Sequence, residues 1–195
     1  MEDKMSKDLI LLSKALMRSQ TRKNAAPAWA LTEIAINKGE ELSDKYGVDK
    51  RLVLTSLYLA HTVFNTEYGG KIQSKHEILS SKFVTKYLKS WNVSENDQKI
   101  ILNAILAHHN KIVAKSLVAR VVKNAECYKF ITLNGSKVYF KELKKRGYTD
   151  SDARKIVIKK MYSKKRLLTL PECKNDATNN CKEIITLFKN NIKRD

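Results

Sequence analysis

Apolar residues recur every three or four positions along much of the chain, and this helical spacing restricts its fold more than any other feature. The segment 6–19 places Leu9, Leu12 and Leu16 on one face. The segment 50–62 is apolar on most faces, which predicts a helix at the centre of the core. Glycine and proline are scarce, 6 and 2 in 195 residues, which disfavours an all-β or a disordered chain. The sequence therefore predicts an all-α fold.

The expected helices divide the chain into a core and an extension. Beyond the two segments above, helices are expected over 27–46, 74–91, 94–109, 115–133, 137–146, 149–160 and 181–192. Loops are expected at 20–26 and 167–180, and a turn is expected at Asn134-Gly135. A helical core is thus predicted over 1–133. A basic helical extension is predicted over 134–195, packed on the same domain.

Positive charge is concentrated in the second half of the chain. The net charge is +18; residues 111–195 hold 22 Lys and Arg against 8 Asp and Glu, whereas residues 1–110 hold 16 against 12. Such an asymmetry is typical of a partner rich in phosphate. The chain is also rich in Lys, Asn and Ile together, which a genome's base composition can impose on any surface. Both interpretations of the charge stay open.

Hydropathy, the N-terminal residues and the cysteines bear on where in the cell the protein is located. No stretch approaches the ~20 apolar residues of a membrane-spanning helix. The first residues lack the basic and then apolar layout of a secretory signal. Cys127, Cys173 and Cys181 form no C-x-x-C pair, which favours free thiols over a disulfide framework or a cysteine zinc site. A cytoplasmic protein without a membrane partner is expected.

All four histidines lie within 57–109 and belong to three successive segments. His61 ends the most apolar run, His76 lies in the first turn of the next expected helix, and His108 and His109 end the one after. Helical proteins build metal and phosphoryl sites in their cores from side chains of facing helices. The four imidazoles are therefore predicted to converge on one internal site.

The order and spacing of these segments resemble the HD-domain superfamily, whose helical members are mostly metal-dependent phosphohydrolases. The resemblance is carried by Leu57-Tyr58-Leu59-Ala60-His61-Thr62, His76-Glu77, Ala107-His108-His109 and Asn124-Ala125-Glu126. Family members show an early His, a His-Asp pair, further His residues in some branches and a final Asp. The resemblance covers about residues 27–133 and implies an HD-like helical bundle.

This chain departs from the family pattern at three ligand positions. No histidine precedes His61, and Trp29 or Leu31 stands near the expected first ligand. Thr62 stands at the position of the Asp of the pair, and Asn124 at the position of the final Asp. A hydroxyl and an amide oxygen, which are neutral and weak ligands, therefore replace two carboxylates. The resemblance with these departures implies an eroded metal site without a cofactor. The predicted function is binding of a phosphate-bearing ligand, either a nucleotide or a nucleic acid, without metal-dependent hydrolysis.

Two alternatives remain. In the first, the chain is a phosphohydrolase of nucleotides or phosphodiesters that uses zinc, iron or manganese. Its metal ligands would be His61, His76 and His108. His61 and His109 would act in catalysis, and Glu67 or Glu77 would add a carboxylate. In the second, the chain is an interaction module whose pocket is filled by Trp29, with the indole N–H bonded to Asn124.

Two groups of cations are candidate phosphate contacts. The candidates for a small ligand, near the histidine segments, are Lys71, Lys75, Lys111, Lys115 and Lys123. Clustered cations neutralise several phosphates together and are the better candidates for nucleic acid. These clustered candidates are Lys144, Lys145, Arg146, Lys159, Lys160, Lys164, Lys165 and Arg166.

Overall fold

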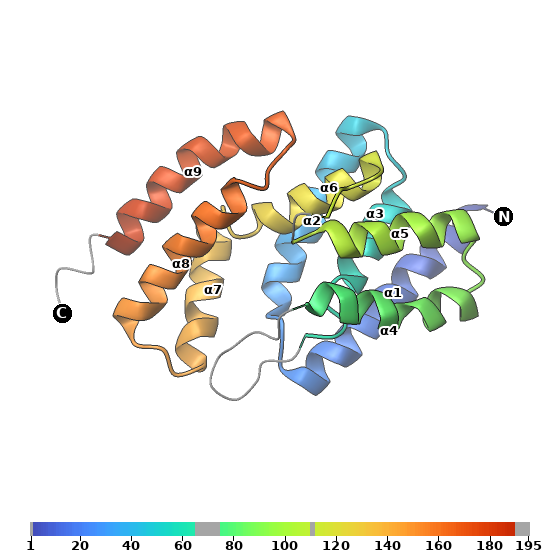
Figure 1. The fold of residues 1–195 in the computed structure, drawn as a ribbon, viewed down its shortest axis with the longest axis horizontal. Helices are drawn as coiled ribbons and strands as arrows, with labels where there is room; N and C mark the ends of the chain where they lie inside the picture. The colour runs from blue at the N-terminus through green and yellow to red at the C-terminus, as the bar shows by residue number, and fades with distance from the viewer. Residues whose placement is uncertain (1, 65–74, 110–111, 190–195) are drawn as a thin grey trace.

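The computed structural model describes residues 2–64, 75–109 and 112–189, and every regular element in these ranges is an α-helix (Figure 1). The helices are α1 (Glu2–Asn24), α2 (Trp29–Tyr46), α3 (Lys50–Leu59), α4 (His76–Ser90), α5 (Glu95–Ala107), α6 (Leu117–Tyr128), α7 (Leu133–Lys145), α8 (Asp150–Lys165) and α9 (Pro171–Lys189). The all-α prediction is confirmed. Within the described ranges, none of these helices is long and apolar enough to cross a membrane.

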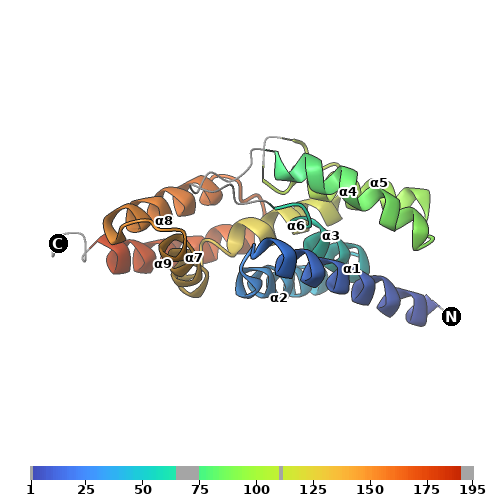
Figure 2. The same cartoon turned by 90° about the horizontal axis from the view of Figure 1, so that it is seen from below.

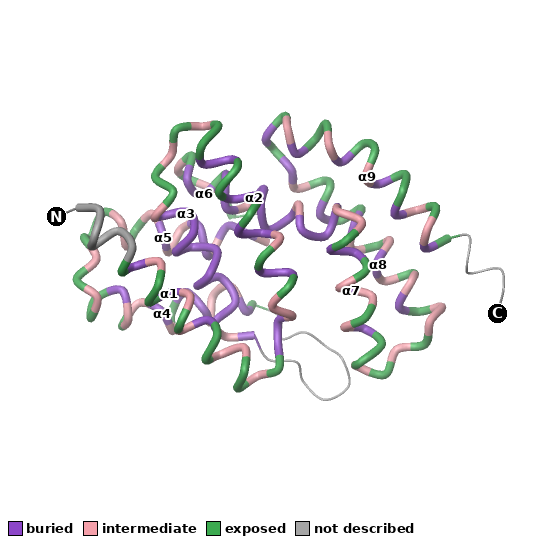
Figure 3. The backbone as a smooth tube through the Cα atoms, turned by 180° about the vertical axis from the view of Figure 1, so that it is seen from behind, coloured by how far each residue is buried: buried purple, intermediate pink, exposed green. Residues whose placement is uncertain are grey.

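Helix α3 lies at the centre of the larger part of the fold. All its residues from Leu52 to Leu59 are buried, as the purple tube in Figure 3 shows. It packs against α1, α2, α5 and α6. Gly39 of α2 lies so close to Leu57 of α3 that a Cβ atom there would overlap the leucine side chain. A larger residue at position 39 would therefore force the Leu57 side chain to move.

The C-terminal helices form the other end of an elongated molecule. Figures 1 and 2 show α7, α8 and α9 at this end and α1, α4 and α5 at the opposite end, with α2 and α6 between them. Helix α7 packs on α2, and α8 and α9 both pack on α6. Because α6 contacts both ends, side chains on its surface can meet residues from the two halves of the chain.

At three places the structure is helical where a loop or turn was expected. Helix α1 continues to Asn24 through the expected loop, because Gln20, Arg22 and Lys23 are good helix formers. The expected turn at Asn134-Gly135 is the first turn of α7, where Thr132 accepts a hydrogen bond from the Gly135 N–H. The expected loop 167–180 is largely the first half of α9, which begins at Pro171, since proline suits a first helical position.

Candidate functional site

The four histidines converge, as the sequence predicts. His61 follows the end of α3, His76 is the first residue of α4, and His108 and His109 follow the end of α5. One nitrogen atom from each ring lies within 4.8 Å of the others. His61, His76 and His108 are buried and His109 is partly buried. Each histidine stands at a helix end, so no imidazole is enclosed by its own helix.

An ion pair that the sequence analysis missed lies against this cluster. Glu126 and Lys129 of the α6 region are 1% and 2% exposed, and their side chains are joined at 2.6 Å. The same carboxylate oxygen, Oε2 of Glu126, lies 2.8 Å from Nε2 of His61. Helix α6 therefore supplies a fully buried carboxylate to the histidine cluster, and the carboxylate already has a cation beside it.

The sequence contains a signal for this pair. Val118, Val122, Ala125 and Glu126 follow the spacing of one helical face, and Lys129 continues it. A carboxylate and a lysine on an apolar stripe are unusual, because charged groups enter a protein interior only when they are paired. Their spacing of three residues allows them to pair with each other along the helix.

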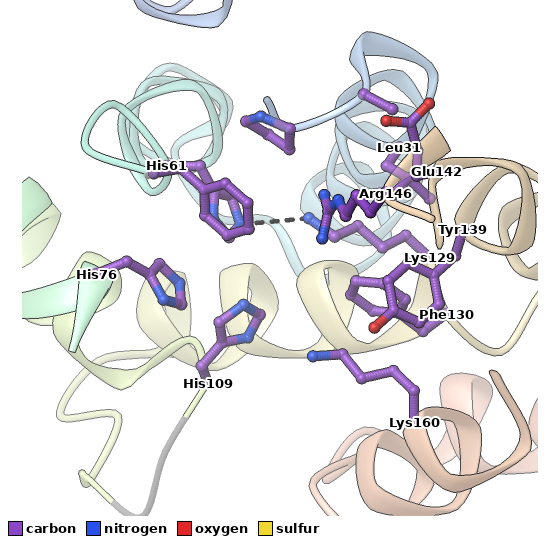
Figure 4. A pocket seen from close by; sticks show the side chains of 13 residues that line it. Leu31, His61, His76, His109, Lys129, Phe130, Tyr139, Glu142, Arg146 and Lys160 are labelled. Atoms are coloured by element: carbon purple, nitrogen blue, oxygen red, sulfur yellow. Dashed lines mark hydrogen bonds between the residues drawn. The ribbon is translucent and has the colours of Figure 1, made fainter. Parts of the chain in front are cut away.

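Hydrogen bonds fix which nitrogen of His61 carries the proton. A carboxylate only accepts hydrogen bonds, so Nε2 of His61 donates to Glu126 at 2.8 Å. Lys129 Nζ also lies 3.3 Å from this nitrogen (Figure 4), but a protonated Nε2 has no lone pair to accept from it, and Lys129 donates to Glu126 at 2.6 Å. The lone pair of His61 is thus on Nδ1, which is buried and has no hydrogen-bond partner in the described part of the chain.

His76 and His108 face each other through their Nε2 atoms. Nδ1 of His108 lies 2.5 Å from the carbonyl oxygen of Ile105, so this nitrogen carries the proton and Nε2 carries the lone pair. Nε2 of His76 lies 3.3 Å from that Nε2. Nδ1 of His76 lies 3.5 Å from a carboxylate oxygen of Glu77. Glu77, one of the two predicted carboxylate partners, therefore stands behind the cluster; Glu67, the other, lies outside the described residues.

His109 has the opposite arrangement. Nζ of Lys164 lies 2.7 Å from Nδ1 of His109. A lysine ammonium only donates hydrogen bonds, so the neutral ring accepts at Nδ1 and carries its proton on Nε2. His109 therefore offers an N–H donor, whereas His61 offers a lone pair.

The environment keeps the imidazoles neutral. Burial lowers the pKa of His61, and it lowers the pKa of His76 to about 2. Burial also holds the pKa of His108 and of His109 well below the usual range, and neighbouring imidazoles add to each shift. Lys129 and His61 together hold the pKa of the Glu126 carboxyl well below its usual range, against the effect of burial. The site thus combines neutral imidazoles with an ionised carboxylate.

A small cavity of about 60 Å³ opens beside the cluster (Figure 4). Its lining combines imidazoles with cations, and Figure 4 shows the Lys129, Lys160 and Arg146 side chains across from His61, His76 and His109. The lining residues are Pro27, Ala28, Leu31, His61, Phe64, His76, His109, Lys129, Phe130, Tyr139, Glu142, Arg146 and Lys160. This volume holds more than one water molecule, and the lining supplies polar partners for a bound group.

The clustered cations that were predicted to bind nucleic acid fall into two groups, one at the cavity and one on the exposed surface. Arg146 and Lys160 line the cavity, and Lys164 bonds His109 at its edge. The remaining members are exposed, and two of them are paired: Lys144 with Asp150 and Lys145 with Glu142. The exposed members are Lys144, Lys145, Lys159, Lys165 and Arg166. Three cations of the predicted outer surface therefore belong to the histidine pocket.

The lysines assigned to a small ligand do not line this cavity where the structure describes them. Lys75 and Lys115 are exposed, and Lys123 is half-buried on α6. Lys71 and Lys111 lie outside the described residues. The cations that line the cavity come instead from the end of α6 (Lys129), the end of α7 (Arg146) and α8 (Lys160).

Trp29 does not fill the pocket, contrary to the filled-module alternative. Its ring stacks on Tyr58 with 6.2 Å between ring centroids, and its N–H donates to Glu33 rather than to Asn124. Leu31, the other residue near the expected first ligand, does line the cavity. An apolar side chain thus occupies this position, which is the physical reason why no ligand atom comes from α2.

Asn124 and Thr62 are structural residues. Oδ1 of Asn124 accepts hydrogen bonds from the N–H groups of Thr169 and Leu170, and its amide donates to Thr169. These bonds hold the chain just before α9. The Thr62 hydroxyl donates to the Leu59 carbonyl. The carboxylate that reaches the cluster is therefore Glu126, two residues after the position to which the sequence analysis assigned the final ligand.

Comparisons with known proteins agree with this architecture. No family model and no curated protein matches the sequence. Solved structures do match: an HD-superfamily hydrolase from Bacillus thuringiensis has 15% identity, a TM-score of 0.69 and coverage of 97% of both chains. Bacillus subtilis YpgQ in complex with ADP has 14% identity, a TM-score of 0.69 and coverage of 100% of this chain and 96% of that one. A Lactobacillus plantarum protein has 14% identity, a TM-score of 0.68 and coverage of 98% of both. The chain therefore has the fold of an HD-superfamily hydrolase.

Proposed function

We propose that the protein binds a small phosphate-bearing ligand in the cavity beside the four histidines. The observation that carries this proposal is the meeting of the cations Arg146 and Lys129 with the N–H of His109 around one small cavity, whose wall also includes Lys160. A phosphoryl group presents several acceptor oxygens and negative charge, and guanidinium and ammonium groups are its usual partners.

The charge balance of the pocket supports an anion. Glu126 is the buried carboxylate of the cluster, and Lys129 pairs with it. Arg146 and Lys164 add positive charge that this pair does not balance. Glu142 lines the cavity but bonds Lys145 at 2.8 Å. An anionic ligand would therefore relieve repulsion among the cations of the pocket.

A groove next to the cavity has room for the part of a ligand that lies beyond its phosphoryl group. The cavity shares Pro27, Ala28 and Glu142 with a neighbouring groove of about 420 Å³, which also includes Trp29 and Lys141. A phosphoryl group in the cavity would place the remainder of the ligand toward this groove. One protein of similar fold, YpgQ, was solved with ADP. A nucleotide is thus a suitable first ligand to test, beside simple phosphates.

Arg146→Ala should weaken the binding of pyrophosphate by about tenfold to a hundredfold, because a hydrogen bond to a charged group contributes about 1.5–3 kcal/mol. The measurement is titration calorimetry with pyrophosphate and with ADP in the presence of a metal chelator. Arg166→Ala is the matched control, since it removes an exposed arginine at the end of α8 that does not line the cavity.

Two outcomes would contradict the pocket assignment. Wild-type protein that binds neither ligand would refute it. Equal affinities for wild type and Arg146→Ala, together with weaker binding by Arg166→Ala, would move the site to the exposed cations. Titrations with RNA and DNA at several salt concentrations would then test the nucleic-acid function, for which we expect a steep loss of affinity with salt.

The histidine cluster favours a second candidate function, metal-dependent phosphoester hydrolysis. In each of three histidines one ring nitrogen contacts an oxygen atom and the other nitrogen is available to a metal. His61 contacts Glu126 through Nε2 and leaves Nδ1. His76 contacts Glu77 and His108 contacts the Ile105 carbonyl through Nδ1, and both leave Nε2. Metal-binding histidines usually direct their other nitrogen to such oxygens. The 3.3 Å between the Nε2 atoms of His76 and His108 equals the separation of about 3.3 Å that two zinc-bound nitrogens have in a tetrahedral site.

The residues present therefore fit a divalent cation, with His61, His76 and His108 as ligands and zinc or iron preferred by this nitrogen-rich set. When bound, such a cation supplies Lewis acidity and an activated water. His109 would hold a proton at Nε2 for a leaving oxygen, because Lys164 occupies its Nδ1. Arg146 and Lys129 would bind and orient the phosphoryl group.

If the protein is a metal-dependent hydrolase, elemental analysis after dialysis should find one zinc ion per chain. His76→Gln should weaken zinc binding by about tenfold or more, because it removes a ligand. The matched control is Glu33→Gln, which changes an acidic residue of α2 that bonds Trp29 outside the cluster. Protein that binds pyrophosphate but retains no zinc would reject hydrolysis through this cluster and leave phosphate binding as the function.

A further inference from the structure

Lys160 differs from the other lysines of the pocket. Lys129 bonds Glu126, and Lys164 bonds His109. In the described part of the chain, Lys160 has no hydrogen-bond or salt-bridge partner; its Nζ lies 4.9 Å from the centroid of the Phe130 ring and faces the cavity (Figure 4). The pocket thus contains an amine that no neighbouring acceptor occupies.

The surroundings of Lys160 favour the neutral amine. Burial lowers the pKa of Lys160 to about 7, and the positive charges of Lys164 and Lys129 lower it further. A lysine with its ordinary pKa near 10.4 is almost wholly protonated at pH 7, whereas about half of a lysine of pKa 7 carries a free lone pair. Desolvation beside other cations is a recurrent way to make a lysine nucleophilic.

We infer that Lys160 is a nucleophile that forms an imine with small phosphate-bearing aldehydes held in the histidine pocket. Three features of the pocket support this assignment: the unpaired Nζ, its position on the cavity wall, and the cations beside it that would hold a phosphoryl group. The inference rests on the proposed phosphate binding, to which it adds an aldehyde as the second functional group of the ligand.

The chemistry is balanced without any further reactant. The lone pair of Lys160 Nζ attacks the carbonyl carbon, and a proton passes from nitrogen to the former carbonyl oxygen. The resulting carbinolamine loses its hydroxyl group and the second amine proton as one water molecule, which leaves a C=N bond. The N–H of His109, on the same cavity wall, is placed to assist departure of the hydroxyl.

The test uses glycolaldehyde phosphate, with borohydride added to reduce the imine to a stable amine and peptide mass spectrometry to locate it. At pH 7 we expect Lys160 to be labelled at least about tenfold faster than its exposed neighbour Lys159, because Lys160 lies on the wall of the cavity that holds the phosphoryl group. Lys160→Arg should abolish this fast labelling, whereas the matched control Lys159→Arg should retain it. Thermal melting verifies that both variants are folded.

Labelling in the presence of pyrophosphate, and labelling with glycolaldehyde, distinguish failure of the imine inference from failure of the proposed phosphate binding. Fast labelling of Lys160 that pyrophosphate suppresses would support both. Glycolaldehyde, which lacks the phosphate, should label Lys160 at least about tenfold more slowly; equal rates would show that the phosphate does not guide the aldehyde and would overturn the inference. Pyrophosphate binding with Lys160 labelled no faster than Lys159 would overturn the inference while the proposed function stands.

Discussion

Glu126→Gln is expected to lower the free energy of unfolding by about 3–5 kcal/mol, because it leaves the Lys129 ammonium buried without its counter-charge. Glu126 is 1% exposed and is bonded to both Lys129 and His61, so water cannot replace the lost interaction. Urea unfolding at neutral pH in the presence of a chelator measures this loss.

The matched comparison is the double variant Glu126→Gln with Lys129→Met. Replacing both members of a buried ion pair costs much less than removing one, so the double variant should recover most of the stability. The cost of the single variants should therefore not be additive. A Glu126→Gln protein as stable as wild type would show that the pair is not closed in solution.

Acid is expected to unfold the protein steeply below pH 6.5. The pKa values of His61, His76, His108 and His109 are all lower in the folded chain than the ordinary 6.5. Below pH 6.5 the unfolded chain therefore binds protons that the folded chain excludes, and stability falls as pH falls. Each histidine contributes about 1.4 kcal/mol per pH unit, or about 5 kcal/mol for all four.

The lowered pKa of Glu126 acts in the same direction below pH 4.5, where the unfolded carboxyl gains a proton that the folded one lacks. Urea unfolding at pH 7, 6 and 5 gives the slope, and a chelator removes the influence of metal. His76→Gln should reduce the slope by about one quarter, since it removes one of the four proton acceptors. Equal stability at pH 7 and pH 5 would show that the imidazoles are hydrated and not enclosed.

The sequence predicted much of this architecture because the responsible signals are local. Helical periodicity located the helices, and the approach of four imidazoles followed from their positions at the ends of apolar segments. Pro171 is a local signal for the start of α9, but the bonds that hold the preceding residues come from Asn124, 45 positions before Thr169. No local pattern reveals a cap that comes from a distant helix.

The pocket itself was harder to predict. Glu126 and Lys129 were recognisable as charges on an apolar stripe, but the resemblance to a family motif drew attention to Asn124 instead. Lys160 and Lys164 were assigned to an outer surface because they stand in a basic sequence. Their direction depends on how α8 packs against α6, a tertiary contact between segments far apart in the chain.

The most direct test of phosphate binding is a crystal structure of the protein with pyrophosphate in a chelator-containing buffer. We expect a phosphoryl group in the cavity, within hydrogen-bond distance of Arg146 and of the His109 N–H, with the Glu126–Lys129 pair intact beside it. Pyrophosphate bound only to exposed cations such as Lys144 or Arg166, with water in the cavity, would contradict it.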